Sequence, residues 1–105
     1  MNRKVILHKS AVEELSLIKQ RVNELFGYNV ANKVVKNLIH LMNVLSVNPY
    51  LGTKDERYSP FLTLHSKHNR IFYLVEDNEI MIVAIWDNRK NEENLQDMLS
   101  KRISE

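Results

Sequence analysis

The chain of 105 residues contains no cysteine, only two glycines and only two prolines. Without cysteine it can form neither a disulfide nor a thiolate nucleophile, which fits a reducing compartment. Two glycines are too few for a glycine-rich phosphate loop, and no G-x-S-x-G nucleophile elbow is present. The sequence therefore gives no support to an ordinary hydrolase, a kinase or a dinucleotide-binding enzyme.

Long hydrophobic runs are also missing. The N-terminal segment MNRKVILHKS has an apolar run of three residues, whereas a membrane-spanning helix needs roughly 20. We therefore expect a cytoplasmic protein that does not contact a membrane. The four histidines form no H-E-x-x-H arrangement, and with no cysteine beside them we expect neither a metal site nor a cofactor.

The composition is that of a folded protein. Hydrophobic residues make up 44% of the chain and charged residues 27%, which argues against disorder and predicts a single domain over residues 1–105. The net charge of +2 is an ordinary solubility charge. A nucleic-acid or acidic partner has to be argued from where the charges lie.

Hydrophobic periodicity predicts a short strand over residues 4–8, followed by two helices. Ser10 and Glu13 have the spacing of a capping box at the start of the first helix, and Gly27 is expected to end it. Asn29 can cap the second helix, which should stop before Pro49 because the residue before a proline avoids helical geometry. The short gap between the two predicts an antiparallel helical hairpin.

The second half of the chain has the alternation of strands. After a loop over residues 48–60 we expect strands over residues 61–65, 70–75 and 80–86, then a C-terminal helix carrying an apolar stripe from Leu95 to Ile103. The order β-α-α-β-β-β-α predicts an α+β fold in which a two-helix hairpin packs on a twisted antiparallel sheet.

The last two strands form a predicted β-hairpin, and its register has a consequence for two arginines. If Asp77-Asn78 is a two-residue turn, counting outward pairs Arg70 with Ile85. Side chains alternate between faces, so Arg70 and Arg89 would then project from the same face at the open end of the hairpin.

The open end of this hairpin collects cationic and histidine side chains, namely His65, Lys67, His68, Arg70, Arg89 and Lys90. Arginine suits phosphate because its planar guanidinium donates two parallel hydrogen bonds and keeps its charge. Two arginines beside a histidine would suit the backbone of RNA. The alternative is that Arg70 and Arg89 pair internally with Asp87 or Glu92.

Three short motifs in order along the chain resemble a known superfamily. Pro49 to Gly52 has the pattern P-x-x-G, Arg70 to Tyr73 has the pattern R-I-x-Y, and an apolar strand leads into Asp87-Asn88-Arg89. Together with the helical hairpin, this order resembles the RelE/ParE superfamily of bacterial toxins from type II toxin–antitoxin systems. The resemblance covers nearly the whole chain.

The resemblance implies a toxin that a separate antitoxin protein neutralises. In the RelE-like branch the target is mRNA in the ribosomal A site, cut by transfer onto the 2′-hydroxyl. This is the activity we expect, with the ribosome and mRNA as partners. Its catalytic residues would be Arg70, Arg89 and His65, and its nucleic-acid-binding residues would be Lys67, His68 and Lys90.

Two alternatives remain open. The tail after Arg89 contains no aromatic residue and no histidine, and this departs from the RelE-like branch, which often has a tyrosine or histidine there. The ParE-like branch inhibits DNA gyrase without a catalytic set, so the departure is no objection to it. An inactive homologue would only bind the antitoxin. Docking places for an antitoxin are the mildly basic surface, the edge of the first strand and the hairpin's apolar face, which the C-terminal helix, a partner segment or both would cover. That face comprises Phe72, Leu74, Met81, Val83 and Ile85.

Overall fold

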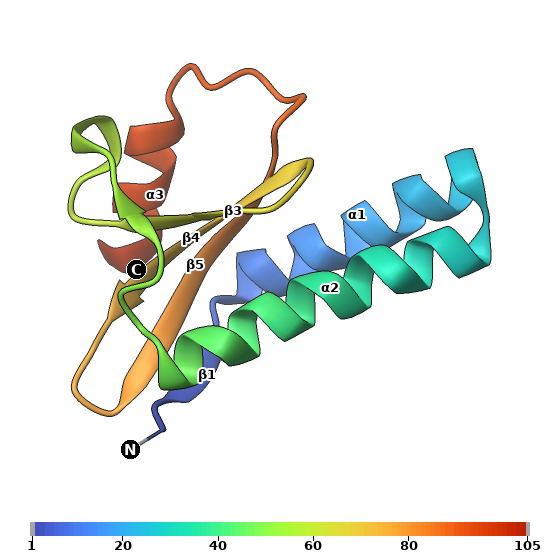
Figure 1. Ribbon diagram of the computed structural model, residues 1–105. Coiled ribbons are helices and arrows are strands. Elements are labelled where there is room, and N and C mark those ends of the chain that lie inside the picture. The colour runs from blue at the N-terminus through green and yellow to red at the C-terminus, as the bar shows by residue number, and fades with distance from the viewer. Residues whose placement is uncertain (1, 105) are drawn as a thin grey trace.

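A computed structural model describes residues 2–104, and its centre is a five-stranded sheet. The strand order is β1-β5-β4-β3-β2, with a helical hairpin on one face and a shorter helix on the other (Figure 1). The predicted α+β fold with a two-helix hairpin on the sheet is confirmed. In chain order the elements are β1 (Lys4–Leu7), α1 (Lys9–Phe26), α2 (Tyr28–Val47), β2 (Thr53–Lys54), the 3-10 turn η1 (Glu56–Tyr58), β3 (Leu62–His65), β4 (Asn69–Val75), β5 (Glu79–Asp87) and α3 (Leu95–Ser104).

The ends of α1 and α2 depart in detail from the predicted caps. The N-cap of α1 is His8, not Ser10, because the imidazole Nδ1 of His8 accepts a 3.0 Å hydrogen bond from the backbone N–H of Ser10. Gly27 ends α1 as predicted, and it also stands in place of Asn29 as the N-cap of α2. With φ 92° and ψ 171°, Gly27 has a backbone conformation that is essentially closed to other residues. A single residue therefore separates the two helices.

Strand β1 gives the sheet a mixed character. It lies at the edge and pairs with β5 in parallel, with Lys4 opposite Glu79 and Leu7 opposite Ile82. The sequence suggested an antiparallel sheet, and β2 to β5 do pair that way. No tight turn joins β1 to β5, so nothing in the connection requires antiparallel pairing.

The β4–β5 hairpin begins in the predicted register. Glu76 donates its backbone N–H to the carbonyl of Glu79 across Asp77-Asn78, and Leu74 lies opposite Met81. Further from the turn the count changes, because Val83 is an extra residue in β5. It forms a β-bulge, which moves every later side chain of β5 to the opposite face.

Because of this bulge, the strand pairing at the open end of the hairpin differs from the predicted pairing. Phe72 lies opposite Ala84 instead of Val83, and Arg70 lies opposite Trp86 instead of Ile85. Ile85 therefore packs in the core beneath the helical hairpin, whereas Trp86 packs on the side of α3.

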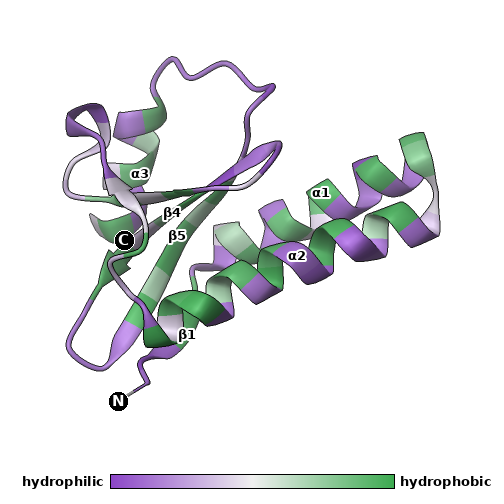
Figure 2. Ribbon diagram, in the orientation of Figure 1, coloured by the Kyte–Doolittle hydropathy of each residue, from purple (hydrophilic) through white to green (hydrophobic). Residues whose placement is uncertain are grey.

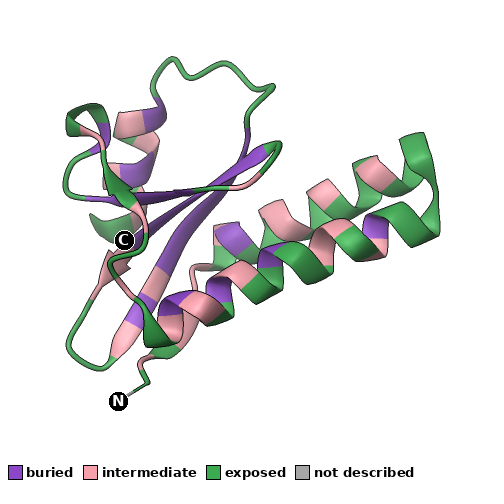
Figure 3. Cartoon of the chain, viewed as in Figure 1, coloured by how far each residue is buried: buried purple, intermediate pink, exposed green. Residues whose placement is uncertain are grey.

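The sheet has a hydrophobic core on each face. Figure 2 shows hydrophobic residues along β4 and β5, and Figure 3 shows the same strands buried. The core beneath α1 and α2 includes Leu38, Leu45, Ile71, Tyr73, Ile80, Ile82 and Ile85. The core beneath α3 and η1 includes Tyr58, Phe61, Phe72, Val83, Trp86, Leu95 and Leu99. Of the hairpin face suggested as a docking place for an antitoxin, Phe72 and Val83 are buried on the side of α3, Leu74 and Met81 are partly buried beside them, and Ile85 lies on the opposite face.

The P-x-x-G and R-I-x-Y motifs meet in one contact. The Tyr73 hydroxyl accepts a 2.9 Å hydrogen bond from the backbone N–H of Gly52 and donates a 2.8 Å hydrogen bond to the carbonyl of Pro49. A Cβ on residue 52 would lie 2.6 Å from that hydroxyl. Both motifs therefore hold the loop after α2 against β4.

Of the helices in residues 2–104, none combines the length and the hydropathy that crossing a membrane requires.

Candidate functional site

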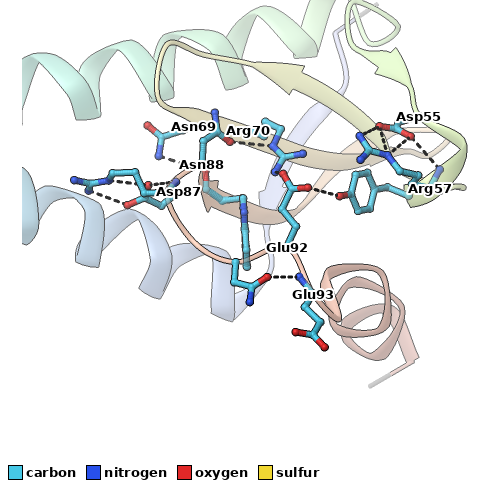
Figure 4. Close-up of polar contacts among 12 residues, drawn as sticks. Asp55, Arg57, Asn69, Arg70, Asp87, Asn88, Glu92 and Glu93 are labelled. Carbon is cyan, nitrogen blue, oxygen red and sulfur yellow. Dashed lines mark hydrogen bonds and ion pairs between the residues drawn. The ribbon is translucent and has the colours of Figure 1, made fainter.

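Arg70 is held inside the fold by the segment that follows β5. Its side chain is only 8% exposed. Its Nε donates a 2.9 Å hydrogen bond to Oδ1 of Asn88, and its Nη2 forms an ion pair with Oε1 of Glu92 (Figure 4). The Tyr58 hydroxyl donates to the other oxygen of the Glu92 carboxylate at 3.2 Å. The guanidinium charge of Arg70 is thus already matched by an internal carboxylate.

Aromatic rings complete the surroundings of Arg70. Its guanidinium carbon lies 5.5 Å from the ring centroid of Phe72 and 5.8 Å from that of Tyr58. These distances are within the range of cation–π attraction. The rings shield the Arg70 side of the ion pair, whereas the Glu92 side chain is 43% exposed and stays in contact with solvent. Arg70 is therefore well suited to anchoring the segment after β5.

Asp87 is the centre of a second network at the end of β5. Its side chain is 7% exposed and accepts hydrogen bonds from two arginines. Arg89 donates through Nε at 3.2 Å, Nη2 at 3.0 Å and its backbone N–H at 3.0 Å, and Arg21 of α1 donates through Nη1 at 2.8 Å. The Asp87 carboxylate thus ties the end of the sheet to the helical hairpin.

The same network lowers one pKa. The side-chain hydrogen bonds from Arg89, aided by its backbone N–H and by the charges of Arg89 and Arg21, lower the pKa of Asp87 from 3.8 to about 2, although burial acts in the opposite direction. The pKa of Arg89 is raised in turn, chiefly by the same hydrogen bonds. Asp87 therefore stays a carboxylate at any physiological pH and is unsuited to proton transfer.

Arg70 and Arg89 do not form the predicted co-facial pair. Arg70 lies on the α3 side of the sheet, packed against Phe72 and Tyr58, whereas Asp87 and Arg89 lie on the side of the helical hairpin. The β-bulge at Val83 is the cause, because it reverses the faces of the residues that follow it. Their internal pairing with Glu92 and Asp87 is the alternative that the sequence left open.

The remaining predicted site residues are spread along the end of the sheet. His65 is exposed at the end of β3, directly opposite Arg70. Lys67 and His68 are exposed in the β3–β4 turn. The Lys90 ammonium lies 5.6 Å from the ring centroid of Trp86. Among residues 2–104, no group of three or more histidine, aspartate or glutamate side chains could hold a metal ion.

Two features of this region were missed from the sequence. Arg21 was not among the candidate residues, yet it contacts Asp87 across 66 positions of the chain. At the end of the first helix, Leu25 is 59% exposed and Phe26 beside it is 67% exposed. A signal for the second feature was present, since apolar residues flank Gly27 where the helix must stop.

Comparison with known families identifies the chain. The family model described as the ParE toxin of type II toxin–antitoxin system, parDE, matches residues 5–92. The chain belongs to the ParE toxin family. The match spans both networks, from Arg21 to Glu92, and the helical hairpin.

A solved structure shares the fold. The toxin–antitoxin structure titled "Chromosomal ParDE TA system from P. aeruginosa" aligns with a TM-score of 0.72 and 21% sequence identity, over 81% of this chain and 95% of that one. No curated protein sequence matches this ParE family member. The superfamily suggested by the three sequence motifs is thus confirmed, and within it the chain matches the ParE family.

Proposed function

We propose that the chain is a ParE-like toxin that acts in the cytoplasm by binding and inhibiting DNA gyrase, and that a cognate antitoxin neutralises it. Membership of the ParE family supports this proposal over ribosome-dependent mRNA cleavage. The observation that carries it is the pairing of Arg70 with Glu92 on one face and of Arg89 with Asp87 on the other.

This pairing argues against a phosphate-cleaving surface. Stabilising charge on a scissile phosphate needs preorganised donors that converge on one point. Arg70 is buried and bonded to Glu92, and Arg89 lies on the other face of the sheet bonded to Asp87. His65 lies opposite Arg70 in the sheet, but the guanidinium beside it is engaged by Asn88 and Glu92. A toxin that acts by surface contact needs no such convergence.

The test is to express the chain from an inducible promoter in bacteria and to follow growth, DNA replication and mRNA integrity together. We expect growth and replication to stop while mRNA stays intact at early times. With purified chain, gyrase supercoiling should be inhibited in proportion to the concentration of the toxin. An Arg89→Ala variant should still leave mRNA intact, because the proposed activity requires no catalytic arginine.

Two results would contradict the proposal. Early mRNA cleavage that Arg70→Ala or Arg89→Ala abolishes would establish the nuclease instead. Unimpaired growth, with gyrase fully active in the presence of the folded chain, would leave an inactive homologue that only binds an antitoxin. Circular dichroism of each variant is the control, because Arg70 is buried and its loss can unfold the chain.

A further inference from the structure

The outer face of α2 carries cations and amides in a single row. Exposed polar residues recur there every three or four positions, which places them on one side of a helix. The row, which we call the α2 stripe, consists of Asn29, Lys33, Lys36, His40 and Asn43. In Figures 2 and 3 hydrophilic and exposed residues recur along α2. Leu38, Met42 and Leu45 lie on the opposite side of the helix and pack in the core, so the α2 stripe points away from the sheet.

Carboxylates are missing from the sequence around this row. Residues 25–54 contain neither aspartate nor glutamate, and neither do residues 57–75. The first segment includes all of α2, and the second includes β3 and β4. Soluble surfaces ordinarily intersperse charges of both signs. A helix of 20 residues whose charged side chains are all cationic departs from that rule and creates a one-signed potential along its outer face.

The lysines of this region have no internal partner, unlike most of the arginines. Five of the six arginines form ion pairs, namely Arg21 and Arg89 with Asp87, Arg57 with Asp55, Arg70 with Glu92 and Arg102 with Glu14. Within the described part of the chain, no carboxylate pairs with Lys33, Lys36 or Lys67. Their ammonium groups are therefore available to an anion from outside.

Lys67 joins the α2 stripe from another element. The side-chain amide of Asn37 on α2 donates a 3.4 Å hydrogen bond to the hydroxyl of Ser66, which brings the β3–β4 turn beside the helix. Lys67 follows Ser66 and is exposed. Lys33 lies about one helical turn before Asn37. The cations thus come from α2 and from the turn next to it, so they form a patch rather than a single line.

We propose that the α2 stripe, together with Lys67, binds the phosphate backbone of duplex DNA without reading its sequence. Lys33, Lys36 and Lys67 bind phosphate oxygens, and the amides of Asn29 and Asn43 donate hydrogen bonds to the same backbone. Binding to a duplex is inferred from this surface alone. That the duplex is the one held by gyrase rests on the proposed function, because gyrase acts on duplex DNA.

The dimensions of the row suit a duplex backbone. Lys33 to Asn43 spans about 15 Å of helix axis, and about four successive phosphates of one DNA strand occupy the same rise. The surface is a convex helix with no pocket along the row, so it can contact a backbone but cannot enclose a small anion. With three lysines engaged, we expect weak binding with a dissociation constant between about 1 and 100 µM.

Other anionic or polar partners fit this surface less well. A single strand is held by stacking its bases on aromatic rings, and the α2 stripe has no phenylalanine, tyrosine or tryptophan. A membrane-binding helix inserts an apolar face, but the apolar face of α2 is buried against the sheet. An acidic protein would need apolar anchors at the centre of its interface, and the α2 stripe offers none.

The experiment measures DNA binding by the purified full chain in the absence of gyrase. A fluorescent 20-base-pair duplex of mixed sequence is titrated, and its anisotropy is followed between 25 and 200 mM salt. The logarithm of the affinity should fall with the logarithm of the salt concentration at a slope of about −3, as expected for about three phosphate contacts. An unrelated duplex of the same length should bind equally well.

Single substitutions locate the contacts. Lys33→Gln, Lys36→Gln and Lys67→Gln should each flatten the slope by about 1 and weaken binding at 50 mM salt by about tenfold. Asn43→Lys adds a cation to the same row, so it should steepen the slope by about 1 and tighten binding. A gain of affinity of this kind is not produced by a loss of folding.

The matched control is Lys101→Gln, which removes the same charge from the other side of the sheet. Lys101 is an exposed lysine of α3. Its loss should leave the slope unchanged and alter the affinity less than about twofold, because salt screens charges farther than about 10 Å away. Circular dichroism melting curves establish that all variants fold.

Four results would overturn the proposal. The first is the absence of saturable binding up to 200 µM protein at 25 mM salt. The second is an equal effect of Lys101→Gln and the three stripe substitutions, which would reduce the binding to net charge. The third is tighter binding of single-stranded DNA or duplex RNA of the same length. The fourth is lysine-dependent binding to vesicles containing phosphatidylserine without binding to the duplex, which would make a membrane the partner.

A supercoiling assay separates this proposal from the proposed function. A variant with Lys33, Lys36 and Lys67 all changed to glutamine should need several times more protein than the wild type to inhibit gyrase, whereas Lys101→Gln should not. Equal inhibition by the triple variant and the wild type would remove the role of the α2 stripe and leave the gyrase proposal standing. Duplex binding by a chain that leaves gyrase active would do the reverse.

Discussion

At the scale of single residues, the two networks show how an arginine can lie in a suggestive motif without being available for catalysis. Arg70 and Arg89 each have an internal carboxylate partner, Glu92 and Asp87. A partly buried charge has to be paired, because removing it from water is costly. Each arginine therefore holds parts of the fold together, and the accessible charge that remains is on Arg21 and Arg89 around Asp87.

The lowered pKa of Asp87 predicts an acid-sensitive contribution to stability. The pKa is about 2 in the folded chain and 3.8 for the ordinary group. The contribution is therefore fully present above pH 4 and is lost as the pH falls from about 4 towards 2. Because Arg21 and Arg89 are partly exposed, we expect it to reach at most about 2 kcal/mol.

The contribution of Asp87 to the free energy of unfolding is measured by urea unfolding between pH 2 and pH 6 for the wild type and for Asp87→Asn. The difference in free energy of unfolding between the two should shrink towards acid. A difference that stays constant over this range would show that the ionisation of Asp87 is not what stabilises the junction. Asp97→Asn, on the exposed side of α3, is a suitable control.

At the scale of elements, the junction between α1 and α2 depends on one backbone conformation. Gly27 is the last cap of one helix and the first cap of the next, and its φ of 92° is in a region that favours glycine. No atom outside its neighbours would lie within 4 Å of an added Cβ. Any destabilisation by a larger residue would therefore come from the backbone and not from a steric clash with the rest of the protein.

Gly27→Ala should lower the free energy of unfolding by about 1 to 3 kcal/mol, the usual strain of such a conformation. Thermal or urea unfolding measures it. Asn29→Ala is the informative comparison, because Asn29 lies inside α2 and does not cap it. A loss of about 1 kcal/mol in Asn29→Ala would instead indicate that Asn29 is the cap.

How much of an element could be predicted depended on whether its signal was local. The helix stop at Gly27, the end of α2 before Pro49 and the turn at Asp77-Asn78 all follow from the conformations of the residues themselves. The bulge at Val83 lies in an uninterrupted apolar run from Ile80 to Trp86, where no glycine or proline marks it. The fold was therefore predictable, but the faces of Arg70 and Arg89 were not.

The side-chain pairs at the candidate site could not be predicted for a related reason. Arg21 and Asp87 are far apart in sequence, and only the packing of α1 over the end of β5 brings them together. Glu92 was considered as a partner of both arginines. It pairs with Arg70 because the segment after β5 carries it to the Arg70 side of the sheet. Pair formation of this kind depends on tertiary structure, which the spacing of residues does not encode.

At the scale of the whole molecule, a buried ion pair joins the three layers. Arg102 of α3 donates to both oxygens of Glu14 of α1 at 2.9 Å and to the carbonyl of Val83 at 3.0 Å. Glu14 in turn accepts a 3.1 Å hydrogen bond from the backbone N–H of Ile85. These two side chains thus satisfy backbone groups of β5 beyond the point where β1 ends, and each is only 12% exposed.

Arg102→Met should therefore destabilise the chain by about 3 kcal/mol, because it leaves the Glu14 carboxylate buried without its cation. The double variant Glu14→Gln with Arg102→Met should lose at least 1 kcal/mol less than the sum of the two single variants. Urea unfolding of all four proteins closes this double-mutant cycle. Additive losses would mean that the two side chains stabilise β5 independently.

The parallel pairing of β1 with β5 has a consequence for synthesis. Residues near the start of the chain find their strand partner only when Glu79 to Ile82 have been made. Contacts this far apart in sequence form late and slowly, because a long loop has to close first. A growing chain that has reached Val75 carries both helices and β4, but it lacks the strand that joins β1 to the rest of the sheet. The Arg21–Asp87–Arg89 network also needs the end of β5, so a ribosome must finish most of this protein before the helical hairpin can be tied to the sheet there.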